Sequence, residues 1–90
     1  MTISEDDIRD ALSLTFKDPT DEFQVIDQSS GCGESYKVII VSNTFEGKKT
    51  FARHKYVNAA LKEEIAKMHA FSQISLTHKE YEERKERDLI

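Results

Sequence analysis

The longest apolar run in this 90-residue chain is Val38-Ile39-Ile40-Val41. A short continuous run rich in β-branched residues is typical of a strand that is buried on both faces of a sheet. We therefore predict a central strand over residues 36–41. A chain of this size buries only about 60–65% of the surface that its unfolded form exposes. The prediction is accordingly a single domain over residues 1–90, with one sheet and one modest core.

Two further segments have the pattern of strands. Residues 23–25 alternate as a half-buried strand, and a short loop should make them antiparallel to the central strand. Alternation returns over residues 69–76, after a helical segment, so this third strand should run parallel to the central one through a right-handed crossover. One of its faces carries Ala70, Ser72, Ile74 and Leu76. A three-stranded mixed sheet with helices packed on one face follows.

Two helical segments contribute apolar faces to this core. Ser4 and Asp7 have the spacing of a capping box that opens a first helix. That helix should end before Asp18-Pro19, because the residue preceding a proline disfavours the α conformation. From Thr50 the sequence is again helical, as one or two helices, with an apolar stripe. The stripe consists of Phe51, Val57, Ala60, Leu61, Ile65 and Met68.

The last helix is predicted from a second capping box, which Thr77 and Glu80 form. Charge pairs at i,i+4 should support this helix, Glu80 with Arg84 and Glu83 with Arg87. The complete order is αββ(α)αβα, an α+β architecture.

The charge balance bears on whether this protein binds nucleic acid. Thirteen Lys and Arg against seventeen Asp and Glu give a net charge of −4. This argues against generic nucleic-acid binding, because phosphate contacts require cations. Residues 48–55 (KKTFARHK) are an exception, with four basic groups and no acid. No apolar run is long enough for a membrane span, and the N-terminus lacks the features of a secretory signal. We expect a cytoplasmic protein, with the nucleus as a second location and no membrane partner.

The segment VSNTFEGKKTFARHKYVN, residues 41–58, carries the motifs that point to a family. It contains a Phe-x-Gly-Lys turn, an Arg-His pair and a Val-Asn pair entering a helix. Further matches lie in residues 61–65, in residues 68–73 and at Thr77. In this order and spacing the chain resembles the BolA-like family over almost its whole length. The Ser-Gly-Cys-Gly loop and the Ala-Phe-Ser-Gln that follows a histidine make it most similar to the eukaryotic cytosolic branch.

This resemblance implies a class II KH-like fold, in agreement with the α+β order. It also implies a non-enzymatic adaptor that shares a [2Fe–2S] cluster with a monothiol glutaredoxin and its glutathione, in a heterodimer or heterotrimer. Cluster trafficking or iron-status signalling would be its role, and an iron-responsive regulator would be a further partner. No cluster is expected on the isolated protein. The family's ligand positions correspond to His69 and to the loop that holds Cys32.

His69 is the stronger metal-ligand candidate. It stands where the helical segment ends and the third strand begins, and a neutral imidazole can replace a thiolate on iron. The alternative is a structural histidine whose imidazole is satisfied by a backbone carbonyl at a helix C-terminus. Cys32 lies between two glycines in a polar loop and should be exposed, whereas free cysteines are usually buried. Such a loop can reach a cluster but cannot preorganise one, so Cys32 ranks lower, with a harmless surface thiol as its alternative.

The basic segment supplies weaker candidates for binding a partner or a nucleic acid. They are Lys48, Lys49, Arg53, His54 and Lys55. These side chains can simply be a solvated basic edge without a function. Alternatively, they contact glutathione carboxylates, acidic residues of a partner or phosphates. The rival function is a KH-like nucleic-acid-binding transcriptional regulator that uses residues 48–55. The net acidity and the absence of a Gly-x-x-Gly loop argue against that function, and the salt dependence of binding would discriminate.

Overall fold

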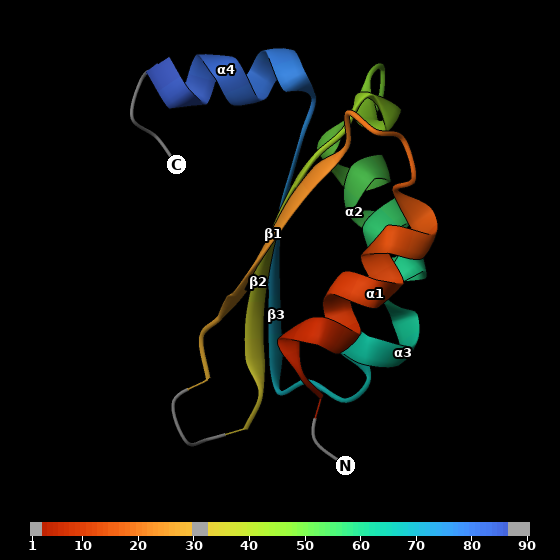
Figure 1. The fold of residues 1–90 in the computed structure, drawn as a ribbon, viewed down its shortest axis with the longest axis vertical. Helices are drawn as coiled ribbons and strands as arrows, with labels where there is room; N and C mark the ends of the chain where they lie inside the picture. The colour runs from red at the N-terminus through yellow and green to blue at the C-terminus, as the bar shows by residue number, and fades with distance from the viewer. Residues whose placement is uncertain (1–2, 30–32, 87–90) are drawn as a thin grey trace.

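The structure is a computed structural model, and it describes residues 3–29 and 33–86. Its elements follow the predicted α+β order (Figure 1). They are α1 (Glu5–Thr15), β1 (Glu22–Asp27), β2 (Ser35–Val41), the 3-10 helix η1 (Asn43–Phe45), α2 (Thr50–Ala60), α3 (Lys62–Ile65), β3 (Ala70–Leu76) and α4 (His78–Glu86). Within the described ranges, no helix has the length and apolar character needed to cross a membrane.

The sheet has the predicted mixed topology, with β2 in the centre of the order β1-β2-β3. β1 runs antiparallel to β2, and β3 runs parallel to it. The parallel register pairs Ser35 with Ala70 and Val41 with Leu76. β2 and β3 therefore begin at the same edge of the sheet, so the residues that precede the two strands meet there although they are far apart in sequence.

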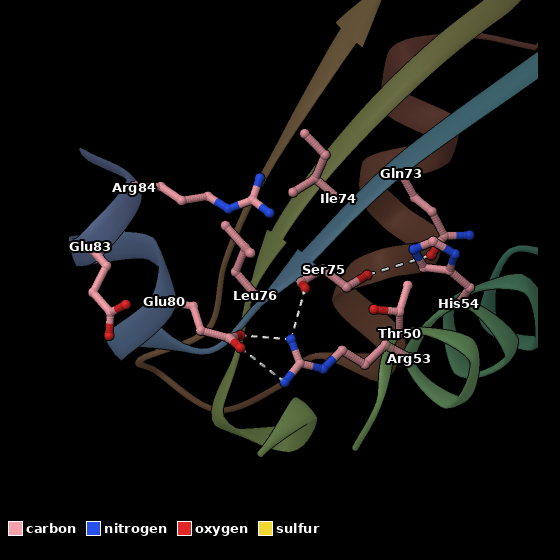
Figure 2. A pocket seen from close by; sticks show the side chains of 10 residues that line it. All are labelled: Thr50, Arg53, His54, Gln73, Ile74, Ser75, Leu76, Glu80, Glu83 and Arg84. Atoms are coloured by element: carbon pink, nitrogen blue, oxygen red, sulfur yellow. Dashed lines mark hydrogen bonds and ion pairs between the residues drawn. The ribbon is translucent and has the colours of Figure 1, made fainter. Parts of the chain in front are cut away.

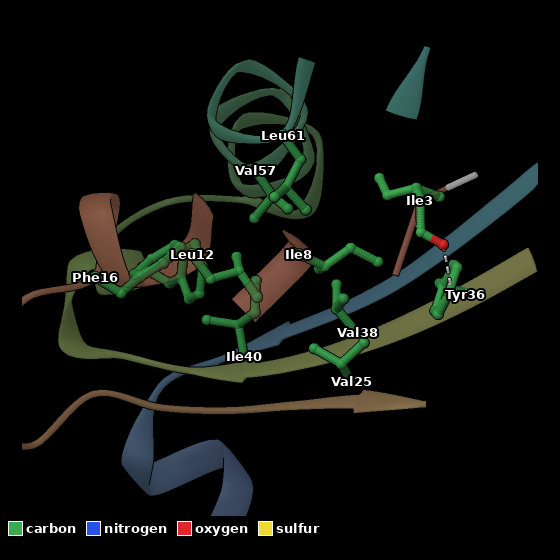
Figure 3. Close-up of a cluster of buried hydrophobic side chains, with 11 residues drawn as sticks. Ile3, Ile8, Leu12, Phe16, Val25, Tyr36, Val38, Ile40, Val57 and Leu61 are labelled. Atoms are coloured by element: carbon green, nitrogen blue, oxygen red, sulfur yellow. Dashed lines mark hydrogen bonds between the residues drawn. The ribbon is translucent and has the colours of Figure 1, made fainter. Parts of the chain in front are cut away.

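Helices α1, α2 and α3 cover one face of the sheet, as predicted (Figure 1). The core between them and the sheet is the cluster of buried side chains in Figure 3. From the sheet it takes Val25, Val38 and Ile40, and from the helices and their cap residues Ile8, Leu12, Phe16, Val57 and Leu61. The Tyr36 hydroxyl donates a hydrogen bond of 3.1 Å to the Ile3 carbonyl and so fastens the segment before α1 to the sheet.

Helix α4 does not lie on the sheet face that α1, α2 and α3 cover. It lies on the other side of the sheet from α1 and α2 (Figure 3). Its Tyr81 lines a small hollow together with Ile39 and Val41, which alternate with the core-facing residues of β2. Ile39 and Val41 are buried, as are Val38 and Ile40. The apolar run is thus buried on both faces, as its composition predicted.

The apolar stripe of the second helical segment is confirmed in part: Val57 and Leu61 are core residues, with Ile65 and Met68 packed against the core. Ala60 is half-buried outside that cluster, and Phe51 is 79% exposed. Phe51 precedes Val57 by six residues, which at about 100° per residue places the two about 120° apart around the helix. Phe45 of η1 takes the core position instead and is fully buried. Its ring lies 5.6 Å from that of Phe16 and 6.4 Å from that of Tyr56, measured between centroids.

These two phenylalanines provide a matched pair of variants. Phe45→Ala should lower the free energy of unfolding by about 3–5 kcal/mol, because it removes a buried ring and leaves a cavity. Phe51→Ala should change it by less than about 0.5 kcal/mol, because the ring is exposed. Urea unfolding followed by circular dichroism measures both values. Equal effects of the two substitutions would contradict this packing.

Candidate functional site

His69 is held by its backbone and presents its side chain to solvent. Its N–H donates to the Glu34 carbonyl at 2.7 Å, and the N–H of Ala70 donates to the same oxygen at 3.3 Å. Both bonds join the start of β3 to the residue just before β2. Because the backbone is fixed and the side chain exposed, the imidazole is available to an outside partner without rearrangement of the fold.

Gly33 lies directly against this imidazole. Its φ of +115° is in a region that favours glycine. A Cβ added at Gly33 would lie 2.9 Å from the Cβ of His69 and 3.3 Å from its Cγ. The loop backbone can therefore approach the histidine only because residue 33 has no side chain.

Cys32, the other predicted ligand, lies outside the described residues. Its role stays a prediction. The structure does bring His69 together with Gly33, the residue that follows Cys32 in the chain.

The other two histidines lie away from this edge. His78 follows β3, and the seven residues of that strand separate it from His69 by roughly 20 Å, at about 3.3 Å per residue. His54 stands on α2 beside a hollow that Gln73 also lines. Among residues 3–29 and 33–86, no group of three or more His, Cys, Asp or Glu side chains is placed to hold a metal ion.

Arg53 is engaged inside the fold, which corrects the expectation that it belongs to a solvated basic edge (Figure 2). Its Nη1 lies 2.6 Å from Oε1 of Glu80 and donates to the Ser75 carbonyl at 3.1 Å. Its Nε donates to the Lys48 carbonyl at 2.7 Å. The side chain is only 14% exposed. Arg53 therefore joins the start of α2, the end of β3 and the first turn of α4.

Glu80 completes this connection. It accepts a hydrogen bond from the Thr77 N–H at 2.9 Å, and its own N–H donates to the Thr77 hydroxyl, so the predicted capping box is confirmed. The predicted pair with Arg84 is wrong within the described residues, because the ion-pair partner of Glu80 is Arg53. Hydrogen bonds from Arg53, followed by that from the Thr77 backbone, lower the pKa of the Glu80 carboxyl.

The remaining basic candidates differ in how far they face outward. Lys49 and Lys55 are exposed, whereas Lys48 donates to the Thr44 carbonyl at 3.2 Å and lies 6.0 Å from the centre of the Tyr56 ring. His54 is half-buried between two hollows along β3. The basic surface available to a ligand is thus smaller than the sequence suggests.

Comparison with known proteins agrees with this architecture. The family model described as BolA-like protein matches residues 9–80, and the chain belongs to this BolA-like family. BolA2-type proteins are among its named relatives. Protein BOLA2 of Arabidopsis thaliana is 52% identical over 60 residues, which cover 67% of this chain and 64% of that protein. BolA-like protein 2 of mouse is 35% identical over 82 residues, covering 90% of this chain and 93% of the mouse protein.

The extent of these matches differs between relatives. The matched segments span between 48% and 64% of the full length of the plant, fission yeast and budding yeast relatives. Among solved structures, a bol-like protein from Babesia bovis superposes with a TM-score of 0.82 at 32% identity, over 94% of this chain and 96% of that one. The solution structure of yeast Fra2 gives a TM-score of 0.72 at 34% identity, over 90% and 86% of the two chains.

The contact between Gly33 and His69 can be tested with two glycine variants. Gly33→Ala should lower the free energy of unfolding by about 1–3 kcal/mol, because backbone strain adds to a clash. It should also shift the NMR signals of the His69 imidazole. Gly47→Ala is the control, since Gly47 has a φ of +78° but no atom within 4 Å of an added Cβ. An unmoved His69 signal in Gly33→Ala would contradict the contact.

The ion pair between Arg53 and Glu80 predicts a pH-dependent contribution to stability. Arg53→Met should lower the free energy of unfolding at pH 7 by about 1–3 kcal/mol, while Lys49→Met changes little. Because the pKa of Glu80 is lowered from 4.5 in the folded state, the stabilisation is present above that value and is lost as the pH falls below it. Urea titrations at pH 7 and pH 3 should therefore show the difference between wild type and Arg53→Met shrinking in acid. A difference independent of pH would refute this account.

Proposed function

We propose that this protein is a non-enzymatic adaptor that holds a [2Fe–2S] cluster jointly with a monothiol glutaredoxin, through His69 and Cys32. The observation that carries the proposal is the contact between Gly33 and His69 at the edge where β2 and β3 begin. Cys32 is bonded to Gly33, and consecutive Cα atoms are about 3.8 Å apart. The chain position of Cys32 is thus one residue from the glycine that approaches His69, which supports a joint role for the two side chains.

The donor set fits a cluster that is only half ligated by this chain. A [2Fe–2S] cluster takes four ligands, and a neutral imidazole is an accepted replacement for thiolate on one iron. The sequence has one cysteine and three histidines, and His54 and His78 lie away from His69. Two ligands from outside, a glutaredoxin cysteine and the thiol of glutathione, complete the set in this proposal. The cluster is cargo, which the adaptor passes on or reports to an iron-responsive regulator in the cytoplasm or nucleus.

The nucleic-acid-binding alternative has less support from the geometry. Arg53 is bonded to Glu80 and to two carbonyl groups, so its guanidinium is not available to a phosphate. Lys49 and Lys55 remain exposed, which leaves a small basic surface on a chain of net charge −4. If nucleic acid were the ligand, its affinity would fall steeply with salt.

Co-expression with a monothiol glutaredoxin tests the proposed function. A coloured heterocomplex should be isolated, with one [2Fe–2S] cluster for each pair of chains by iron and sulfide analysis. The protein expressed and reconstituted alone should remain colourless. A stoichiometric cluster on the isolated chain, or no complex with any monothiol glutaredoxin, would contradict the proposal.

Within that complex, His69→Ala should change the cluster more than Cys32→Ala does. The backbone of His69 is fixed by two hydrogen bonds to Glu34, whereas a residue between two glycines loses more conformational entropy when it ligates. Visible circular dichroism of the two variant complexes measures the effect, and Lys55→Ala serves as a surface control. Equal effects, or a larger effect of Cys32→Ala, would reverse the ranking.

A further inference from the structure

β3 is an edge strand, and its outward backbone groups can be identified from its hydrogen bonds. The Leu76 carbonyl accepts a hydrogen bond from the Ser42 N–H, and the Ala70 N–H donates to the Glu34 carbonyl. The backbone N–H and C=O groups of the even-numbered residues of β3 therefore point toward β2. The Ser75 carbonyl accepts from Arg53 instead. Because backbone groups alternate in direction along a strand, the N–H and C=O of Phe71 and Gln73 point outward with those of Ser75. In the described part of the chain, Arg53 on Ser75 is the one hydrogen bond made to this outward row.

Two hollows lie along this edge and meet at His54 and Gln73, which line both. The hollow on the side of α3 measures about 690 Å³, and the other, on the side of α4, about 680 Å³. The first has an apolar floor of Ile65 and Phe71 and a cation, Lys62, at its rim. The Gln73 side chain donates to that of Asn58 at 2.8 Å and holds the wall between β3 and α2. Space for side chains therefore exists beside an unpaired strand edge.

From this arrangement we infer that the β3 edge binds an extended acidic segment of a partner protein by strand addition. The backbone of the segment pairs with the outward groups of Phe71 and Gln73, as in other complexes where a peptide adds to a sheet edge. Its side chains alternate between the hollow on the helix side and the opposite face, where Ile74 lies (Figure 2). Pairing ends at Ser75, because Arg53 already occupies that carbonyl.

The charges of the groove select an acidic segment. Lys62 and Arg84 line the two hollows, and within the described ranges neither has a carboxylate within ion-pair distance. Glu80, a lining residue, is neutralised by Arg53, which leaves Glu83 as the opposing carboxylate at the α4 end. Carboxylates directed toward Lys62, alternating with apolar side chains beside Ile74, complement this surface. A nucleic acid has no row of amides to pair with the edge.

The test uses the protein without iron and without glutaredoxin, so its outcome is independent of the proposed function. The probe is a fluorescein-labelled peptide of seven alternating valines and glutamates, blocked at both ends. Saturable binding should be seen by fluorescence anisotropy, and the Phe71 and Gln73 amides should gain protection from hydrogen exchange. Gln73→Pro should weaken binding about tenfold, because it removes an outward N–H while keeping the bonds to β2. Gln73→Ala, which keeps that N–H, should weaken it less than about threefold.

Two further comparisons make the test independent of how well Gln73→Pro folds. A peptide methylated at alternate amide nitrogens should fail to bind the wild-type protein. Lys62→Glu should weaken binding more than Lys67→Glu, because Lys67 is exposed but outside the groove. No saturable binding up to millimolar peptide, or equal affinity for the methylated peptide, would overturn the inference. So would self-association through β3 that excludes the peptide, or its displacement by an oligothymidine with steep salt dependence.

Discussion

The parallel pairing of β2 with β3 is the constraint on which the rest of the structure depends. Antiparallel neighbours joined by a hairpin would place the starts of the two strands at opposite edges. Parallel pairing brings both starts to one edge, and the crossover through α2 and α3 covers the face that the strands share. This pairing is what places Gly33 beside His69. The candidate ligand site is a product of topology, with hydrogen bonds to Glu34 as its local anchor.

A second long-range interaction decides what the basic segment can do. By sequence, residues 48–55 are four cations without an acid, which suggests a phosphate-binding edge. In the fold, Arg53 is withdrawn from that edge and bonded to Glu80, across the sheet end from α2 to α4. The same guanidinium donates to the Ser75 carbonyl and so ends the row of free outward carbonyls on β3. One arginine thus reduces the basic surface, attaches α4 and limits the length of any added strand.

Most of the fold follows from the sequence because burial imposes periodicity. The short β-branched run at Val38 is typical of a buried strand. The capping boxes at Ser4 and Thr77 depend on residues three apart, so both features were predictable. The errors lie where a local rule competes with tertiary contacts. Phe51 was grouped with Val57 although the helical angle between them is wrong, and Glu80 was paired with Arg84 although Arg53 is its partner. Cys32 lies outside the described residues, so its part in the site stays a prediction.

The contact between Gly33 and His69 was accessible in principle from the sequence, since a parallel β-α-β unit implies that the loop before β2 and the residue before β3 share an edge. What periodicity does not supply is the approach distance, which depends on a positive φ at Gly33 and on the missing side chain there.

The two ends of β3 present different groups. At its start a histidine is presented to solvent, and at its end Arg53 closes the edge, with outward amides between them. A partner that lies along the unpaired side of β3 would reach His69 without any change in the sheet, because the strand that carries the outward amides also positions the imidazole.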